Sequence, residues 1–271
     1  MRLSGKISAC FVACVFLVSM LAPLVLQRDP DAIDLDSLRT PPSLHHPLGT
    51  DNKGRDIMAR VIYGGRISIG VSVVAGLFSM GIGLCVGLLA GYGGGKADAA
   101  LMAITDLVLS FPSLLLAIGV SVVFPPGIYT VMIALSSVGW ASFARLIRGQ
   151  VLTLKESPCI EAARAVGCSS GRIIVLHLLP QCIPIALVMT GLKLGGYILT
   201  ESALSFLGLG AQPPTATWGS MISANRAYIY AAPWMVLSPG IMIALTALCF
   251  NLLGDELRDR CGIDPEGRAA G

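Results

Sequence analysis

The sequence is poor in charged residues. Asp, Glu, Lys and Arg make up only 13% of its 271 residues, whereas soluble globular domains carry about 25%. With 54% hydrophobic residues, the chain lacks the polar surface that a water-soluble fold requires. A membrane protein is therefore predicted. The net charge of +3 comes without a dense basic stripe, which excludes a nucleic-acid partner.

Histidine is scarce as well, since His45, His46 and His177 are the only three and all lie outside the long apolar runs. An intramembrane protease needs a nucleophile–base pair or a ligand cluster within its spans, and no G-x-S-x-G or H-E-x-x-H motif occurs. That remote alternative is disfavoured. The eight cysteines show no CxxC pair or other metal-ligand spacing, so no metal site is predicted.

What the chain does have is long apolar runs. A helix of about 20 apolar residues crosses a bilayer core, and six runs qualify: 7–26, 67–90, 99–124, 128–144, 183–207 and 227–254. The first resembles a signal peptide, but it is longer than a signal core and lacks an A-x-A-like cleavage site, so an uncleaved span is expected. The predicted fold is an all-α polytopic membrane protein with six transmembrane helices.

The distribution of basic residues predicts the orientation. With the N-terminus inside, eleven Lys and Arg residues fall on the cytoplasmic side and seven outside, while Lys193 lies within a span. Because cytoplasmic loops are enriched in Lys and Arg, both termini are expected in the cytoplasm. The predicted parts are an N-terminal tail with the first span (1–26), an extracytoplasmic segment (27–66), a core with five spans (67–260) and a cytoplasmic tail (261–271).

The long polar loop 150–181 lies on the predicted cytoplasmic side. Ser157 followed by Pro158 is typical of a helix start, and Gly167 favours a left-handed stop. A second helix, capped by Ser169 or Ser170, is expected to end at Pro180. A short helix that presents alanines outward suits docking into the groove of a partner, and an ordinary cytoplasmic loop is the alternative.

The same loop carries a motif. Glu161-Ala162-Ala163, Gly167 and Leu179-Pro180 resemble the E-A-A-x3-G-x9-I-x-L-P signature of ABC importer permeases, with His177 in place of the isoleucine. The resemblance implies that this loop is the coupling helix that docks on an ATPase subunit. His177 is interpreted as a surface residue without a chemical role.

Three further stretches extend the resemblance over residues 28–260. They are His46–Asp51 with Gly54-Arg55-Asp56 and Arg60, Ser205–Gly210 with Pro213-Pro214 and Trp218-Gly219, and Asn251–Asp255. They look like the dipeptide/oligopeptide/nickel permease family, and specifically its C-type subunit. The resemblance implies a type I importer fold in a bacterial inner membrane. It also implies three kinds of partner: a second permease, two ATPase subunits and an extracytoplasmic binding protein. The implied cargo is di- or oligopeptides, with nickel or a nickel chelate as the alternative.

A nucleotide site is not predicted in this chain. Residues 91–97, Gly-Tyr-Gly-Gly-Gly-Lys-Ala, lack the G-x-x-x-x-G-K-[ST] spacing and the hydroxyl that would hold magnesium. ATP and Mg²⁺ are therefore expected on the ATPase subunits, and this chain is expected to be a transporter subunit with no cofactor and no catalytic site. A stand-alone channel or secondary carrier is disfavoured by the coupling-type loop.

Asp106, Lys193 and Glu201 are ionisable residues within predicted spans, where charge is costly. Asp106 and Lys193 are hypothesised to form an interhelical ion pair, with separate solvation in a water-filled cavity as the alternative. For Glu201, near the outer end of its span, a structural contact is expected.

The outer segment carries four aspartates between Asp29 and Asp36 and is expected to be a solvated loop that meets the binding protein. Arg55, Asp56 and Arg60 have the spacing of one helical face, and they are predicted to form part of that docking surface.

Overall fold

The computed structural model describes residues 3–21 and 29–260, and every regular element in this part of the chain is helical. The all-α prediction is confirmed. Four continuous helices are long and apolar enough to cross a membrane: α3 (Ile57–Gly93), α6 (Ile128–Leu154), the run Ser170–Phe206 and α11 (Trp234–Arg260). The pair α4 (Gly95–Ser110) and α5 (Ser113–Val123) forms a bent fifth candidate, and α1 (Leu3–Met20) is shorter.

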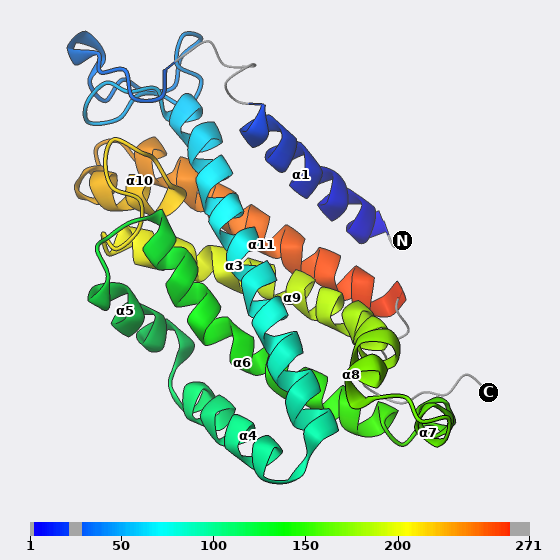
Figure 1. The fold of residues 1–271 in the computed structure, drawn as a ribbon. Coiled ribbons are helices and arrows are strands. Elements are labelled where there is room, and N and C mark those ends of the chain that lie inside the picture. Colours follow the sequence, from blue (N-terminus) through cyan, green and yellow to red (C-terminus); the bar gives the residue numbers. More distant parts are fainter. Residues whose placement is uncertain (1–2, 22–28, 261–271) are drawn as a thin grey trace.

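The centre of the bundle is the contact between α3 and α6, which run side by side (Figure 1). Gly83 and Gly87, four residues apart, face Phe143 and Ile147 on α6. A Cβ atom at Gly83 would lie 2.2 Å from the Phe143 Cβ, and one at Gly87 would lie 2.7 Å from the Ile147 Cβ. Small residues at this spacing let two membrane helices approach closely, so this pair forms the spine of the fold.

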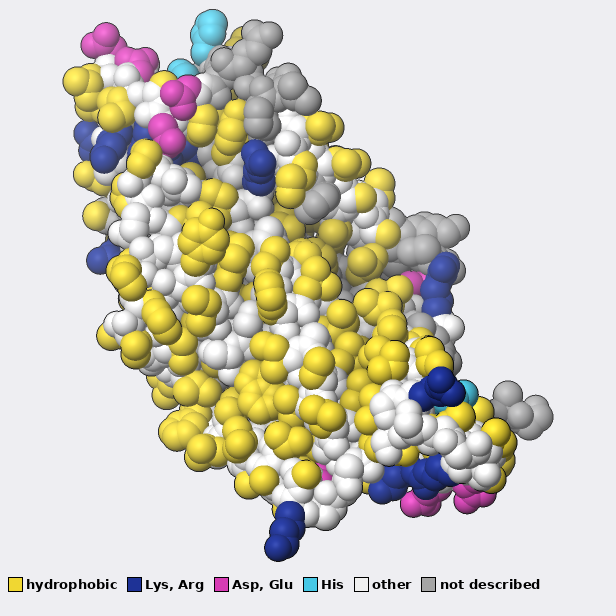
Figure 2. All heavy atoms as spheres, viewed as in Figure 1, with side chains coloured by type: hydrophobic (Ala, Val, Ile, Leu, Met, Phe, Trp, Pro, Cys, Tyr) yellow, Lys and Arg dark blue, Asp and Glu magenta, His cyan; other side chains and the backbone are white. Residues whose placement is uncertain are grey.

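The two ends of the bundle differ (Figure 1). Residues 29–56 and the short helix α10 (Trp218–Asn225) lie at one end, and α7 (Pro158–Ala165) projects at the other, the end toward which α1 begins and α11 terminates. Charged side chains gather at these two ends, and hydrophobic side chains cover the surface between them (Figure 2). This distribution matches an apolar belt around a membrane-spanning bundle.

The third predicted span, 99–124, is not one straight helix. α4 and α5 are bent by 95° at a break formed by Phe111 and Pro112. Pro112 has no N–H to donate and disfavours helical backbone in the residue before it; Phe111 is accordingly extended, with φ −90° and ψ 143°.

Other boundaries also differ from the prediction. α3 starts at Ile57, ten residues before the predicted start of the second span at Ile67, because Asp56 caps it by accepting a hydrogen bond from the Ala59 N–H at 2.9 Å. The last span is shifted to Trp234–Arg260, and Arg226–Tyr228 ahead of it forms a single 3₁₀ turn, η3.

Pro180 does not end a helix, contrary to the prediction. α8 (Ser170–Ile173) passes through a π-helical turn, η2 (Ile174–Leu178), into α9 (Leu179–Phe206). Pro180 falls in the first turn of α9, where a missing N–H is tolerated. The wider turn, in which the Leu179 N–H bonds to the Ile174 carbonyl, lets the helix continue past the proline ring.

Candidate coupling helix and polar contacts of the bundle

Both ends of α7 form where the sequence predicts them. Ser157 occupies the N-cap position with extended backbone, although its side chain makes no capping hydrogen bond, and Pro158 is the first helical residue. Gly167 has a φ of +84°, and the Cys168 N–H donates to the Ala163 carbonyl at 3.0 Å. A residue with a Cβ is strained in this left-handed conformation, so glycine is needed at the stop.

Apolar packing and one contact between an arginine and an aromatic ring attach α7 to the bundle. Ile160 is fully buried in a cluster that includes Leu88, Val151 and Leu178. The Arg164 guanidinium lies over the Tyr92 ring, 5.4 Å from its centroid. α7 therefore sits where α3, α6 and the start of the Ser170–Phe206 run meet.

The remaining surface of α7 is open. Glu161, Ala162, Ala165 and Gly167 are exposed, and Val166, just after the helix, is 84% exposed. Of the other predicted coupling residues, Ala163 and Leu179 are half-buried against the apolar cluster, and Pro180 is exposed. Some residues of the motif therefore pack against the bundle at the end where α7 lies, and the others are exposed on its surface.

The predicted Asp106–Lys193 ion pair is wrong. The Asp106 carboxylate pairs with Arg145 of α6, and the Lys193 ammonium donates instead to the Ser142 hydroxyl at 2.9 Å. The spacing of residues along the chain could not predict this partner, because the pairing depends on how α4 and α6 are rotated about their axes.

A second ion pair between α4 and α6 was not predicted. Arg148 donates to both carboxylate oxygens of Asp98, at 2.5 and 2.6 Å, in a bidentate arrangement. Together with Asp106 and Arg145, it fastens α4 along α6. The available signal was the spacing: Asp98 and Asp106 lie two turns apart on one helix, and Arg145 and Arg148 lie one turn apart on the other.

Glu201 is 1% exposed and makes the structural contact expected of it. Its carboxylate accepts hydrogen bonds from the Ser205 hydroxyl at 2.7 Å and the Ser202 hydroxyl at 3.3 Å. All three residues lie near the C-terminal end of α9, and Ser68 of α3 also hydrogen-bonds the carboxylate. The carboxylate is therefore held by serines of two helices.

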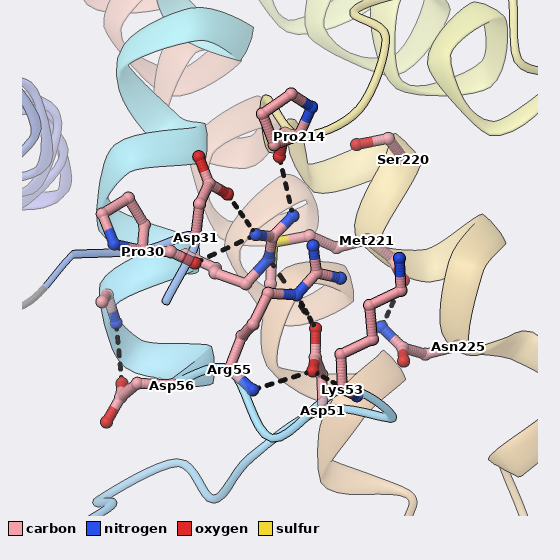
Figure 3. A network of polar contacts seen from close by, with 12 residues as sticks. Pro30, Asp31, Asp51, Lys53, Arg55, Asp56, Pro214, Ser220, Met221 and Asn225 are labelled. Carbon is pink, nitrogen blue, oxygen red and sulfur yellow. Dashed lines mark hydrogen bonds and ion pairs between the residues drawn. The ribbon is translucent and has the colours of Figure 1, made fainter. Parts of the chain in front are cut away.

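The prediction that Arg55, Asp56 and Arg60 expose charge for docking is wrong, because all three are buried. The Arg55 Nε donates to the Asp51 carboxylate at 2.7 Å, and the Arg60 Nη1 donates to the Asp31 carboxylate at 2.6 Å (Figure 3). Arg55 and Asp56 also precede α3, so the three residues do not share a helical face.

Arg60 connects segments far apart in the sequence. Its guanidinium also donates to the backbone carbonyls of Pro30 at 3.0 Å and Pro214 at 3.4 Å. In addition to capping α3, the Asp56 carboxylate is hydrogen-bonded to the His46 Nδ1 at 2.9 Å. These contacts fold residues 29–56 into a fixed cover over the N-terminal end of α3.

Two features of this cover were not predicted. Hydrogen bonds from Ser37 and from the Asp36 backbone N–H lower the pKa of Asp34, which caps a single 3₁₀ turn, η1 (Leu35–Ser37). In α10, the fully buried Trp218 donates its indole N–H to the Val61 carbonyl at 2.9 Å, which joins α10 to α3.

The apolar belt, the multi-pass helical bundle and the short helix exposed between two spans define a membrane permease. The chain belongs to the family described as binding-protein-dependent transport system inner membrane component, whose model matches residues 83–261. It is a multi-pass inner-membrane permease subunit of an ABC importer, a class that works with ATPase and permease partners.

Curated relatives agree over almost the whole chain. It is 38% identical to a putative peptide transport system permease of Brucella suis, over 100% of this chain and 90% of the relative. It is 40% identical to the dipeptide permease DppC of Alkalihalophilus pseudofirmus, over 94% of this chain and 83% of that one. It is 42% identical to the glutathione permease GsiD of Escherichia coli O6:K15:H31, over 96% of this chain and 85% of that one.

A solved structure supports the fold alone. The inward-facing MetNI methionine ABC transporter matches with a TM-score of 0.58 at 21% identity, covering 75% of this chain and 97% of the matched chain. The type I importer fold expected from the motifs is therefore supported by overall shape as well as by sequence.

Proposed function

We propose that this chain forms one half of the translocation path of an ATP-driven importer of di- or oligopeptides. The named relatives from Brucella suis, Alkalihalophilus pseudofirmus and Escherichia coli are described as peptide, dipeptide and glutathione permeases. They favour a peptide cargo and lend no support to the nickel alternative.

The observation that carries the coupling role is the exposure of α7. Glu161, Ala162 and Ala165 face outward while Ile160 is fully buried, so a partner can dock on one side of α7 and push on the bundle through the other. ATP and Mg²⁺ are bound by two separate ATPase subunits. Their closure favours one of two membrane conformations, and no bond is made or broken within this chain.

In the proposed orientation α7 and both termini lie in the cytoplasm, in keeping with the excess of Lys and Arg on that side. Residues 29–56 then face outward, toward an extracytoplasmic binding protein that delivers the cargo. Ile33, Leu35 and Leu44 of that segment are between 59% and 102% exposed, which provides apolar contact area for docking. The buried Arg55, Asp56 and Arg60 support this surface from beneath.

Reconstitution tests the proposal. The purified permease pair and its ATPases are placed in proteoliposomes, and uptake of labelled alanyl-alanine is measured in the presence of ATP. The measurement is repeated without the binding protein and, separately, without the ATPases. Uptake is expected only when all components and ATP are present. Uptake at full rate without the ATPases would show instead a channel or secondary carrier, and uptake of nickel in place of the dipeptide would exclude the peptide assignment.

A further inference from the structure

A half-open cavity lies in the flank of the bundle, where the break between α4 and α5 faces α6 and α9. Its volume is about 280 Å³, and Leu109, Phe111 and Ser113 line it on the side of the break. That volume is near the lower end of the range for small-molecule sites, about 300–1,000 Å³.

The break between α4 and α5 forms part of the wall of this cavity. The 95° bend at Phe111 and Pro112 interrupts helical hydrogen bonding inside a segment that is apolar enough to span the membrane. Non-helical backbone at membrane depth is tolerated where it is buried in protein or lines an aqueous space. Phe111 and Ser113, on either side of Pro112, both line the cavity, so the backbone break lies in its wall.

Lys193 lines the same cavity from the middle of α9. It lies 14 residues after Leu179 and 13 before Phe206, which places it about 20 Å from either end of the helix. Its ammonium group is half-buried and donates to the hydroxyl of Ser142, which also lines the cavity. The side chain is thus fixed toward the cavity by α6.

The neighbouring carboxylates are already engaged elsewhere. Asp106 pairs with Arg145 and Asp98 with Arg148, while Glu201 is held by serines and does not line the cavity. Among the contacts of the described residues, Lys193 has no carboxylate partner. An ammonium ion without a counter-charge at membrane depth attracts an anion strongly, because low dielectric strengthens the interaction.

We infer that this cavity is a recognition site for a carboxylate of the cargo, with Lys193 as the cation that receives it. The inference rests on the proposed peptide transport, since a linear peptide carries a carboxylate at its C-terminus. The Thr200 side chain adds a hydroxyl to the lining, and Val108, Leu135 and Val138 provide apolar walls for the rest of the cargo.

The test compares two probes that differ at the carboxylate: labelled alanyl-alanine and alanyl-alanine amide. Equilibrium dialysis measures binding of each probe to the complete purified transporter without binding protein. The unaltered transporter is expected to bind alanyl-alanine about tenfold more tightly than the amide, the size expected for one charge-assisted hydrogen bond. Lys193→Met is expected to bind both probes alike, and Lys193→Arg to retain the preference.

Lys96→Met is the matched control, since Lys96 is exposed at the turn between α3 and α4 and does not line the cavity. It is expected to behave as the unaltered transporter. A second readout is the uptake of alanyl-alanine into proteoliposomes, with ATP hydrolysis measured in parallel. Uptake should fall about tenfold in Lys193→Met while hydrolysis stimulated by binding protein is kept.

Three results would overturn the inference. The first is equal binding of the two probes by the unaltered transporter, and the second is an unchanged preference in Lys193→Met. The third is loss of subunit assembly in Lys193→Met with full assembly in Lys193→Arg, which would make Lys193 an ion-pair partner of the second permease. Failure of the unaltered transporter to take up alanyl-alanine would instead count against the proposed function, whatever Lys193 does.

Discussion

The two ends of this molecule, which the proposed orientation makes the outer end (residues 29–56 and α10) and the inner end (α7), are fastened by different interactions. At the outer end, the buried Arg55, Arg60 and Asp51 and the half-buried Asp31 hold residues 29–56 on α3, and Arg60 also binds the Pro214 carbonyl in the segment before α10. At the inner end, α7 is attached through the apolar side chain of Ile160 and the Arg164–Tyr92 contact.

The difference matches what each end has to do. Buried charge pairs demand exact geometry, because an unpaired charge in the interior is costly, so they specify one arrangement of the outer cover. Apolar burial is non-directional and tolerates small changes in angle. The outer end can therefore serve as a fixed platform, while α7 can stay attached as a partner moves.

Removing a charge from the outer platform should have the largest effect. Arg60→Ala leaves the 1%-exposed Asp51 and the half-buried Asp31 without this guanidinium. Breaking a buried pair from one side costs about 3–5 kcal/mol. The expected result is a large loss of folded protein, measured as the yield and thermal unfolding midpoint of the purified complex.

Arg66→Ala is the control for that change, because Arg66 lies on the same helix less than two turns away and is exposed. It is expected to leave the unfolding midpoint nearly unchanged. Equal midpoints for the two variants would contradict the contrast drawn between the two ends.

The apolar anchor of α7 comes next in size. Ile160→Ala removes a fully buried side chain from the cluster with Leu88 and Val151, and such truncations cost about 2–5 kcal/mol. Because the neighbouring spans α3 and α6 also pack extensively against each other, the complex should still insert while transport per ATP hydrolysed falls. Val166→Ala, at a position that is 84% exposed, should leave stability unaltered. A drop in stability in Val166→Ala as large as in Ile160→Ala would contradict the assignment of inner and outer faces.

The smallest energetic change concerns the stop of α7. Gly167 has a φ of +84°, and a β-branched residue there is strained by about 1–3 kcal/mol. Gly167→Val is expected to shift the end of α7 and to uncouple ATP hydrolysis from uptake without loss of membrane insertion. Gly171→Val, at an exposed helical position with open space around its Cβ, is the matched control. If transport in Gly167→Val stays coupled to ATP hydrolysis, this end of α7 has no role in docking.

The features predicted correctly from sequence are those set by neighbouring residues. Ser157, Pro158 and Gly167 define the ends of α7 through local backbone preferences. The break at Pro112 was missed for a different reason. Its signal was present, but the surrounding apolar run was long enough to look like a single span.

The features missed are those that depend on packing between distant segments. The burial of Arg60 requires Asp31 and Pro214, which lie 29 residues before it and 154 after it. The choice of Arg145 over Lys193 as partner of Asp106 depends on helix rotation, which an apolar pattern without a polar face does not specify.

The π-helical turn at Ile174–Leu178 has a mechanical consequence. Because the chain does not break there, residues Ser170–Phe206 form one helical run of 37 residues, about 55 Å along its axis. One extremity adjoins α7, and the other ends beside Glu201 and the loop that leads to α10. A displacement of the extremity beside α7 is therefore carried along a single continuous helix, and the π turn and Pro184 are the two points at which that helix can bend.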